Sequence, residues 1–380
     1  MQNKSTFYEF FAGGGMARAG LGEAWECLLA NDISPMKAAA YAENYGADHL
    51  HVGDIYDLNA AVLPGQPRLA WGSFPCQDLS LAGAGAGLGG DRSGCFWGFW
   101  KLIQGLSKDG RKPPLVVLEN VFGALTSHDG ADFDAIIKAI VGEGYTAGVV
   151  VVDAIHFVPQ SRPRVFILGV DKSYHLPESM IAAGPSPAWH PEALIRAHTR
   201  LPPRFKKSWV WLNPPGPQLR IKTLDDVIER DPKGVSWHTA AETKRLLEMM
   251  APLHREKVLK AQALGCLTVG TIYRRTRLGV QRAEVRFDGI AGCLRTPSGG
   301  SSRQTIIVVE GPRIRTRLLS PREAARLMGL DDSYKLPTRY NDAYHVAGDG
   351  VVVPVVAHIA RTVLEPILAA NSMVNLRKAA

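Results

Sequence analysis

Short apolar runs alternate with glycine turns and helical stretches over the first 170 residues of the chain. The runs typical of buried strands lie at residues 6–11, 26–31, 51–52, 68–71, 115–118, 147–152 and 165–170. A glycine turn and a helical stretch over 17–25 follow the first run, and the run at 115–118 is apolar throughout, as a central parallel strand should be. This order of strand, turn and helix predicts an α/β domain with a Rossmann-like sheet.

The pattern changes in the second half of the chain, where proline, tryptophan and arginine become more frequent. We expect one helix over 240–264, and basic loops rich in hydroxyl groups and glycine at 273–277 and 296–303. Regularity returns with a helix at 321–328 and a final helix at 356–368. The pattern therefore predicts a second, smaller domain of mixed structure before the C-terminal helix.

The composition is that of an ordinary globular protein, with 46% hydrophobic and 21% charged residues. No run of about 18 apolar residues is present and the N-terminus lacks a signal-peptide core, so we expect a cytoplasmic protein. The cysteines are Cys27, Cys76, Cys95, Cys266 and Cys293. They form no CxxC pair and no Cys/His cluster at ligand spacing, so we expect free thiols and neither a disulfide framework nor a metal site.

The net charge of +8 is unevenly distributed along the chain. Residues 172–317 hold 25 Lys and Arg against 12 Asp and Glu, a net charge of +13. The remainder holds 19 against 24, a net charge of −5. A basic segment in an acidic frame is either a solvated face or a surface that binds a polyanion, and an imbalance of this size favours nucleic acid.

Three successive strand ends carry residues suited to binding a nucleoside. The glycine turn with Gly13 and Gly15 lets backbone approach a ligand closely, with helix N–H groups pointing at it. Asp32 follows the second strand, where a carboxylate reaches ribose hydroxyls, and Asp54 follows the third. The alternative is that both aspartates cap the helices that follow. A Rossmann dehydrogenase would explain the glycine turn alone, but neither Cys76 nor the basic segment.

The fourth and fifth strands end in groups that suit catalysis. Pro75 favours an extended residue before it, so the chain should leave a strand here with Cys76 exposed, although an isolated cysteine is more often buried and inert. Glu119 ends the apolar strand at 115–118, and a carboxylate there is costly to desolvate unless it has partners or a task. On an extended segment further on, alternating Arg162 and Arg164 should point the same way.

A thiol, a carboxyl and two guanidinium groups at one sheet edge favour covalent activation of a nucleic-acid base. Carbon 5 of cytosine is a poor nucleophile, and adding a thiolate at carbon 6 makes it enamine-like and able to take a methyl group. Nearby arginines favour the thiolate, and Glu119 suits the ring nitrogen 3. A stacked base must first be flipped out of the duplex, and the glycine-rich stretch at 82–94 suits closure over it.

The ordered motifs resemble those of DNA (cytosine-5) methyltransferases over nearly the whole chain. They are Phe11-Ala12-Gly13-Gly14-Gly15, Pro75-Cys76-Gln77, Glu119-Asn120-Val121, Gln160 with Arg162 and Arg164, and the blocks at 317–329 and 348–355. One tripeptide alone is weak, whereas six motifs in family order are very specific.

The resemblance implies S-adenosyl-L-methionine as methyl donor, Cys76 as nucleophile, Glu119 at nitrogen 3, and Arg162 and Arg164 holding base and site. The cofactor positions that we predict are Phe11, Gly13, Gly15, Asp32, Ile33, Asp54, Ile55, Pro75, Asp349 and Val351. We expect a catalytic domain at 1–175, a target-recognition domain at 176–334 and a segment at 335–380 that completes the catalytic domain. The expected substrate is double-stranded DNA, methylated by a monomer, with any cognate restriction endonuclease acting separately.

One position departs from the family pattern, because Gly348-Asp349 stands where the family usually carries Gly-Asn. An Asp there alters the local charge, but activity should survive because each group that does chemistry is present. Two alternatives remain: a tRNA cytosine-5 methyltransferase on the same fold, and a DNA-binding protein without catalysis. The long basic segment argues against the first, and intact Cys76 and Glu119 argue against the second.

Overall fold

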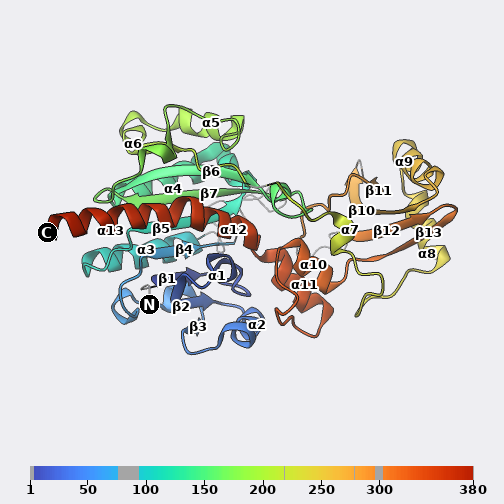
Figure 1. Ribbon diagram of the computed structural model, residues 1–380, viewed down its shortest axis with the longest axis horizontal. Coiled ribbons are helices and arrows are strands. Elements are labelled where there is room, and N and C mark those ends of the chain that lie inside the picture. The colour runs from blue at the N-terminus through green and yellow to red at the C-terminus, as the bar shows by residue number, and fades with distance from the viewer. Residues whose placement is uncertain (1–3, 76–93, 218, 278, 296–302, 380) are drawn as a thin grey trace. The chain divides into compact units, whose positions relative to one another are not determined.

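The computed structural model describes residues 4–75, 94–217, 219–277, 279–295 and 303–379. The chain divides into two compact units (Figure 1). The first unit comprises Met1–Asp153, Pro163–Pro217 and Val353–Ala380, and the second comprises Ala154–Arg162 and Gln218–Val352. The two units are defined by how the chain packs and not by function. The catalytic domain at 1–175, the target-recognition domain at 176–334 and the completing segment at 335–380 therefore stay predictions.

The first unit is built on a large mixed sheet. Its strands are β1 (Ser5–Phe10), β2 (Trp25–Asp32), β3 (Leu50–Val52), β4 (Leu69–Gly72), β5 (Leu115–Val121), β6 (Tyr145–Asp153), β7 (Pro163–Asp171), β8 (Ile181–Ala182) and β9 (Trp209–Leu212). Among the described residues, their order is β3-β2-β1-β4-β5-β7-β6-β9-β8. The strands predicted over the first 170 residues all form, within one to three residues of their expected ends.

Strand β7 runs antiparallel to both of its neighbours, β5 and β6. Only residues 154–162 connect β6 to β7, and a parallel crossover needs a dozen or more residues. The beginning of β7 therefore lies at the sheet edge where β4 and β5 end. In this register Arg164 pairs with Val121, which places it beside the Glu-Asn-Val motif.

Helices cover both faces of this sheet. They are α1 (Met16–Leu21), α2 (Pro35–Tyr45), α3 (Cys95–Lys108), α4 (Ala131–Gly142), α5 (Glu192–Arg200), α6 (Pro203–Lys206), α12 (Val353–Ile359) and α13 (Glu365–Ala379). Short turns complete the unit: η1 (Ile55–Asp57), η2 (Ala60–Val62), η4 (Phe122–Leu125), η5 (Ser127–Gly130), η7 (Glu178–Met180) and the π-helical η8 (Ala360–Leu364). One core cluster joins Phe10 of β1 and Leu118 of β5 to Phe99 of α3 and Ile136 of α4.

Helix α12 packs on helix α1, and α13 continues from the same helical run across the sheet (Figure 1). A Cβ atom added at Gly20 would lie 2.4 Å from the Val356 side chain, so α1 and α12 pack too closely for a larger residue there. Trp25 Nε1 donates to Glu365 Oε1 at 3.1 Å, which ties β2 to α13. The stretch Tyr340–Met373 is long and apolar enough to span a membrane, but 61% of its most apolar window is buried inside the protein, as in a core helix.

The second unit contains a four-stranded antiparallel sheet in the order β11-β10-β12-β13. Its elements are η6 (Ala154–His156), α7 (Leu224–Val227), α8 (Ala240–Glu248), α9 (Pro252–Ala263), β10 (Leu267–Arg277), β11 (Val280–Arg286), β12 (Thr305–Glu310), β13 (Arg313–Leu318), α10 (Pro321–Leu327) and α11 (Tyr340–Asp349). A small core forms where Val258 and Ala261 of α9 pack on Ile272, Val285 and Ile307 of the sheet.

Three helix predictions were wrong in extent, and the loop predicted at 273–277 belongs to strand β10. The final helix expected over 356–368 is part of a helical run from Val353 to Ala379. The helix expected over 17–25 ends at Leu21, because Gly22 adopts φ +73° and Trp25 already begins β2. The single helix expected over 240–264 is two helices, α8 and α9. Pro252 explains the break, because it has no N–H to continue a helix and is well suited to the first helical turn.

A buried ion pair holds helix α10 to strand β13 in the second unit. Arg317 and Glu323 are both fully buried, and two Arg317 nitrogens donate to the two Glu323 oxygens at 2.6 and 2.7 Å. Glu323 also accepts from the backbone N–H groups of Ser320 and Glu229. The segment Ser320-Pro-Arg-Glu323 is thus a capping box whose glutamate also neutralises a buried arginine.

The first unit contains a buried carboxyl of a different kind. Glu9 on β1 is 1% exposed, and its Oε1 accepts from the Arg18 backbone N–H at 3.3 Å. Its Oε2 has no hydrogen-bond partner among the described residues. Burial raises the pKa of Glu9 to about 8, although the nearby Arg18 charge acts against the rise. Glu9 is therefore protonated near neutral pH.

Replacing Glu323 by Ala should remove about 3–5 kcal/mol from the free energy of unfolding, because Arg317 would keep a buried charge without its partner. Urea denaturation followed by circular dichroism measures this loss. The matched control is Glu248→Ala, whose partner Lys244 lies at 3.9 Å on an exposed surface, and which should cost less than about 1 kcal/mol. Equal losses in the two variants would contradict the assignment.

The pH dependence of stability should carry the signature of Glu9. Its pKa of about 8 in the folded protein lies above the ordinary value of 4.5, so the folded state retains a proton that the unfolded chain releases. The stabilisation is complete below 4.5 and is lost as the pH rises through 8. We expect Glu9→Gln to flatten this part of the profile of thermal midpoint against pH between 5 and 9. The exposed Glu26→Gln should keep the wild-type slope, and a wild-type slope in Glu9→Gln would reject the idea.

Candidate active site

The glycine turn after β1 is held in conformations that few residues adopt. Gly13 and Gly15 have φ values of +56° and +77°, and Phe11 is a rare non-glycine residue at φ +59°. A Cβ atom at Gly15 would lie 2.6 Å from the Tyr45 ring and 2.9 Å from the Tyr41 ring. Packing therefore requires glycine at 15. Backbone strain at Phe11 suggests a turn shaped for binding.

Gly13 differs from Gly15 because it borders open space. No described atom lies within 4 Å of the position that a Cβ atom would take at Gly13. Its backbone N–H donates to Asp32 Oδ2 at 2.8 Å, and Ser34 N donates to Asp32 Oδ1 at 2.8 Å. The ends of β1 and β2 are thus joined through Asp32, with an open surface over the turn that fits a ligand.

The end of β3 is joined to β2 in the same way. The buried Asn31 side chain donates to the carbonyl oxygens of His51 and Gly53, at 3.2 and 2.9 Å. This amide aligns the strand ends that carry Asp32 and Asp54. Asp54 Oδ1 accepts from Tyr56 N and so caps the η1 turn, as the alternative interpretation had it.

The two apolar residues predicted to contact the cofactor differ in exposure. Ile33, after β2, is 65% exposed and presents an apolar side chain to any ligand over the turn. Ile55, after β3, is 3% exposed and belongs to the core of the unit. Ile33 is therefore the one of the two that is accessible in the structure.

The segment after β4 is tied to the end of β5. These strands are parallel neighbours, with Gly72 opposite Leu118, so both end at one edge of the sheet. The buried Asn120 donates to the Phe74 carbonyl oxygen at 3.4 Å. Pro75 is exposed, and Cys76 lies outside the described residues. Asn120 therefore fixes the chain just before the predicted nucleophile, beside the strand that carries Glu119.

Glu119 and Arg164 form an ion pair at this edge. Arg164 Nε lies 3.2 Å from Glu119 Oε1, and only 14% and 10% of the two side chains are exposed. The β5–β7 register makes them diagonal neighbours on one face, because Arg164 is opposite Val121. Arg164 can thus orient the Glu119 carboxyl while a ligand approaches the remaining oxygen.

Arg162 makes a separate set of contacts inside the second unit. Arg162 is 3% exposed, and its guanidinium donates to the carbonyl oxygens of Leu294, Gly348 and Gly350 at 2.8–2.9 Å. Five donors in a rigid plane suit such a convergent set of acceptors. Arg162 therefore connects two distant segments of the unit, which is the contact set of a positioning residue.

The carbonyl groups on both sides of Asp349 are those that Arg162 holds. Asp349 itself ends helix α11, with its Oδ2 3.9 Å from His345 Nδ1 one turn earlier. Val351, also predicted to contact the cofactor, is buried. Asp349, which departs from the family pattern, thus lies in a backbone segment that Arg162 holds on both sides.

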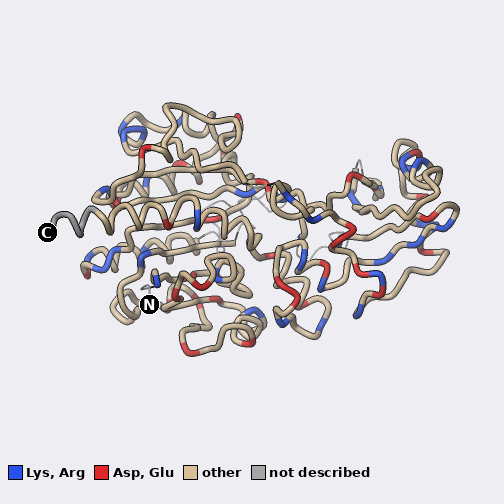
Figure 2. Tube along the Cα trace, in the orientation of Figure 1, with Lys and Arg blue, Asp and Glu red and all other residues tan. Residues whose placement is uncertain are grey.

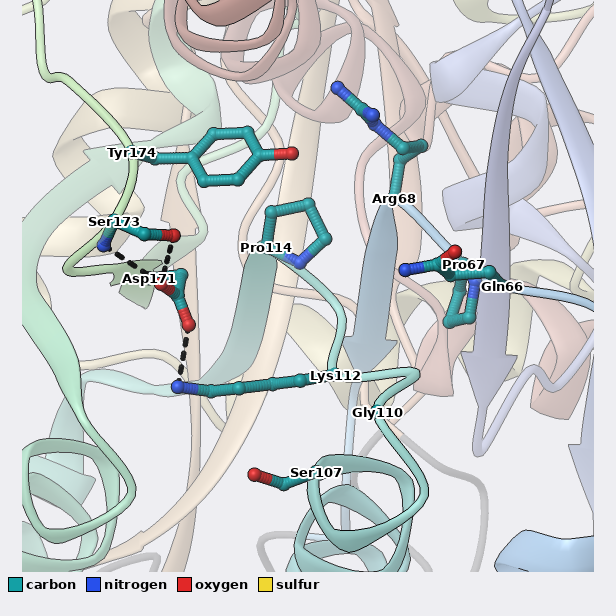
Figure 3. Close-up of a pocket in the computed structure, with 10 residues that line it drawn as sticks. All are labelled: Gln66, Pro67, Arg68, Ser107, Gly110, Lys112, Pro114, Asp171, Ser173 and Tyr174. Atoms are coloured by element: carbon teal, nitrogen blue, oxygen red, sulfur yellow. Dashed lines mark hydrogen bonds and ion pairs between the residues drawn. The ribbon is translucent and has the colours of Figure 1, made fainter.

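A cavity of about 330 Å³ opens at the opposite edge of the first unit's sheet (Figure 3). Arg68 and Pro114 precede β4 and β5 there, and Asp171 ends the antiparallel β7. Burial by itself raises the pKa of Asp171, but hydrogen bonds from Lys112 and Ser173 outweigh it and hold that pKa below its ordinary value. The cavity is therefore separate from the strand ends that carry Glu119 and Arg164. The described residues also hold no cluster of three or more His, Cys, Asp or Glu suited to a metal.

Three polar residues near the strand ends that carry Asp32 and Glu119 were not among the predicted site residues. They are Glu9, Asn31 and Asn120, and each is buried within or at the end of an otherwise apolar strand. A buried amide or acid is costly unless it has hydrogen-bond partners, so such a residue at a strand end is itself a signal. The partner of Glu9 is on helix α1, and those of Asn31 and Asn120 lie at or just after the ends of β3 and β4, so they are visible only in the folded chain.

Comparison with known proteins places the chain in one family. The sequence profile of the C-5 cytosine-specific DNA methylase family matches residues 5–365. The Type II methyltransferase M.BsuFI of Bacillus subtilis is 26% identical over 373 residues, covering 98% of this chain and 75% of that protein. The Type II methyltransferase M.NlaX of Neisseria lactamica is 25% identical over 375 residues, covering 97% and 98%.

A solved structure shows the same fold. It is that of a putative DNA modification methyltransferase encoded within an E. coli prophage, with a TM-score of 0.58 at 17% identity, covering 96% of this chain and 100% of that one. These matches confirm the α/β methyltransferase fold, the enzyme class and the resemblance inferred from the ordered motifs. The chain belongs to the C-5 cytosine-specific DNA methylase family.

Proposed function

We propose that the protein transfers a methyl group from S-adenosyl-L-methionine to carbon 5 of a flipped cytosine in double-stranded DNA, through a covalent bond to Cys76. The observation that carries the proposal is the meeting of three strand ends at one sheet edge. The Phe74-Pro75 segment is tied to β5 by Asn120, and Glu119 of β5 is paired with Arg164 of β7. Glu119 and Arg164 are two of the groups that covalent activation of a cytosine requires, and Cys76 follows Pro75 directly in the sequence.

The glycine turn suits the methyl donor. The open surface at Gly13 and the carboxylate of Asp32 beside it fit a nucleoside, and the exposed Ile33 side chain can cover an adenine ring. Phe11, Gly15, Asp54, Ile55 and Pro75 complete the proposed set in the first unit, and Asp349 and Val351 that in the second. When bound, S-adenosyl-L-methionine supplies an electrophilic methyl group.

The remaining chemistry is carried by side chains. The Cys76 thiolate attacks carbon 6 of the flipped base, and the electron pair of the 5,6 double bond makes carbon 5 nucleophilic. The Glu119 carboxyl hydrogen-bonds ring nitrogen 3 and stabilises the charge that develops in the ring. Arg164 orients Glu119 from 3.2 Å, and its positive charge favours the thiolate. After methyl transfer, water takes the proton from carbon 5. The C5–H electron pair re-forms the 5,6 double bond as the carbon–sulfur bond at carbon 6 breaks, which restores the thiolate.

Cys76→Ser should reduce transfer of labelled methyl groups from S-adenosyl-L-methionine to DNA to background, because a serine hydroxyl is not ionised near neutral pH. Glu119→Gln should lower kcat roughly 10²–10⁴-fold, the usual contribution of a group that handles a proton or a developing charge. Cys266→Ser, at an exposed thiol of the second unit, is the matched control and should keep wild-type activity. Equal labelling by wild type and Cys76→Ser would exclude the covalent mechanism, and labelling of tRNA in place of DNA would favour the RNA alternative.

The biological role we infer is DNA modification by a cytoplasmic monomer, alone or beside an independently acting restriction endonuclease. The relatives M.BsuFI and M.NlaX are Type II methyltransferases, which supports this role.

Expression in a host without cytosine methylation should place 5-methylcytosine at one short recurring sequence in the genome. Conversion sequencing that resolves 5-methylcytosine measures this directly, with Cys76→Ser as the control strain. Methylation spread without sequence preference would contradict sequence-specific modification.

A further inference from the structure

In the sheet of the second unit, strands β10 and β11 pair with each other beyond the point where β10 stops pairing with β12. Strand β10 pairs with β12 only over Leu267–Ile272, whereas it pairs with β11 as far as Arg277. Beyond Ile272 the two strands therefore continue as a two-stranded ribbon, which comprises residues 273–277 and 280–284 and is called the basic ribbon below. The ribbon is anchored to the unit at Ala283, which is buried and whose backbone N–H donates to the Met249 carbonyl oxygen at 3.1 Å.

Two arginines stand directly opposite each other on the basic ribbon. Arg275 pairs with Arg282 in the strand register, and both are exposed to solvent. Side chains opposite each other across two antiparallel strands have Cβ atoms roughly 5 Å apart, so like charges there are destabilising. Glu284 lies 3.7 Å from Arg275 and offsets part of this, but no described residue forms an ion pair with Arg282. The ribbon therefore holds more positive charge than its own fold neutralises.

The two arginines are on the face of the sheet that helix α9 does not cover. Ala283 and Val285 of β11 point into the core against α9, and side chains alternate along a strand, so Arg282 points the other way. Following the register through β12 to β13, Arg313 and Arg315 share this face. Thr271, Ile306 and Arg317 on this face are buried, and Arg315 lies over the Trp237 ring. Arg313 is directly opposite Glu310. The exposed positive charge of this face is therefore concentrated at the basic ribbon.

The partner that fits this surface is a nucleic-acid duplex. The second unit holds 24 Lys and Arg against 15 Asp and Glu, a net charge of +9, and its basic residues are seen along strands and helices in Figure 2. The major groove of DNA admits a two-stranded ribbon, with phosphates along both of its rims. A phosphate placed between or beside two opposed arginines also removes their mutual repulsion.

We propose that Arg275 and Arg282 of the basic ribbon each neutralise a phosphate of the DNA substrate, so that the ribbon is a docking element of this enzyme. The inference rests on the proposed function, because it assumes a DNA substrate. It also predicts an unusual pairing of effects: removing the two charges weakens DNA binding and leaves the fold as stable as before or more stable.

The test compares two double variants that lose the same charge. Arg275→Gln/Arg282→Gln changes the ribbon, and Lys257→Gln/Lys260→Gln changes two exposed lysines on α9, at the opposite face of the sheet. Binding to a fluorescently labelled 30-base-pair duplex of mixed sequence is measured between about 0.05 and 0.3 M salt. Each lost phosphate contact lowers the slope of log K against log salt by about 0.9, so the ribbon variant should lose about 2 in slope and roughly 10–100-fold in affinity at 0.1 M salt.

The α9 control should keep the wild-type slope, and the thermal midpoint of the ribbon variant should equal or exceed that of wild type. The inference is overturned if the ribbon variant keeps the wild-type slope, if the α9 variant loses as much, or if the ribbon variant melts at a lower temperature, since the arginines would then be structural. Methyl transfer by wild type is scored separately. If wild type transfers no methyl group but the ribbon variant still loses salt slope in DNA binding, the proposed function is rejected and the DNA contact of the ribbon stands.

Discussion

The antiparallel pairing of β7 with β5 is the constraint on which the candidate site depends. It brings the start of one strand to the end of another and sets Arg164 diagonally across from Glu119, 3.2 Å apart. In a purely parallel sheet the start of β7 would lie at the other edge, far from the segment after β4. The short connection of residues 154–162 enforces this direction, because it cannot cross over the sheet.

The same edge is stabilised by buried polar groups that do no chemistry themselves. Asn31 joins β2 to β3, Asn120 joins β5 to the segment after β4, and Asp32 joins β1 to β2 through Gly13. Each hydrogen bond links the ends of two neighbouring strands, where an unsatisfied amide or acid would be costly. Glu9 is the exception, because its Oε2 has no hydrogen-bond partner among the described residues and burial raises its pKa to about 8, so that it keeps its proton near neutral pH.

The second unit shows how one short motif can organise a domain. The block that begins at Arg317 is one of the ordered motifs of the sequence, and its buried pair with Glu323 is structural: Glu323 caps α10 and the pair fixes β13 beside it. That pair holds one side of a small sheet whose other side ends in the basic ribbon. The buried Arg317, paired with Glu323, and the exposed Arg282, which has no ion-pair partner among the described residues, illustrate two uses of arginine, one for the fold and one available for a polyanion.

The sequence alone determined the strand order along the chain, the glycine turn and the family, because alternating apolar runs and six ordered motifs are local patterns. Local patterns also misjudged the extent of two helices, because Gly22 ends the first and Pro252 divides the second. Only the tertiary structure decided which polar groups meet. Arg162 and Arg164 are two residues apart, yet one holds backbone carbonyl groups and the other a carboxylate. Such partners come from strand direction and register, which depend on contacts between residues far apart in the chain.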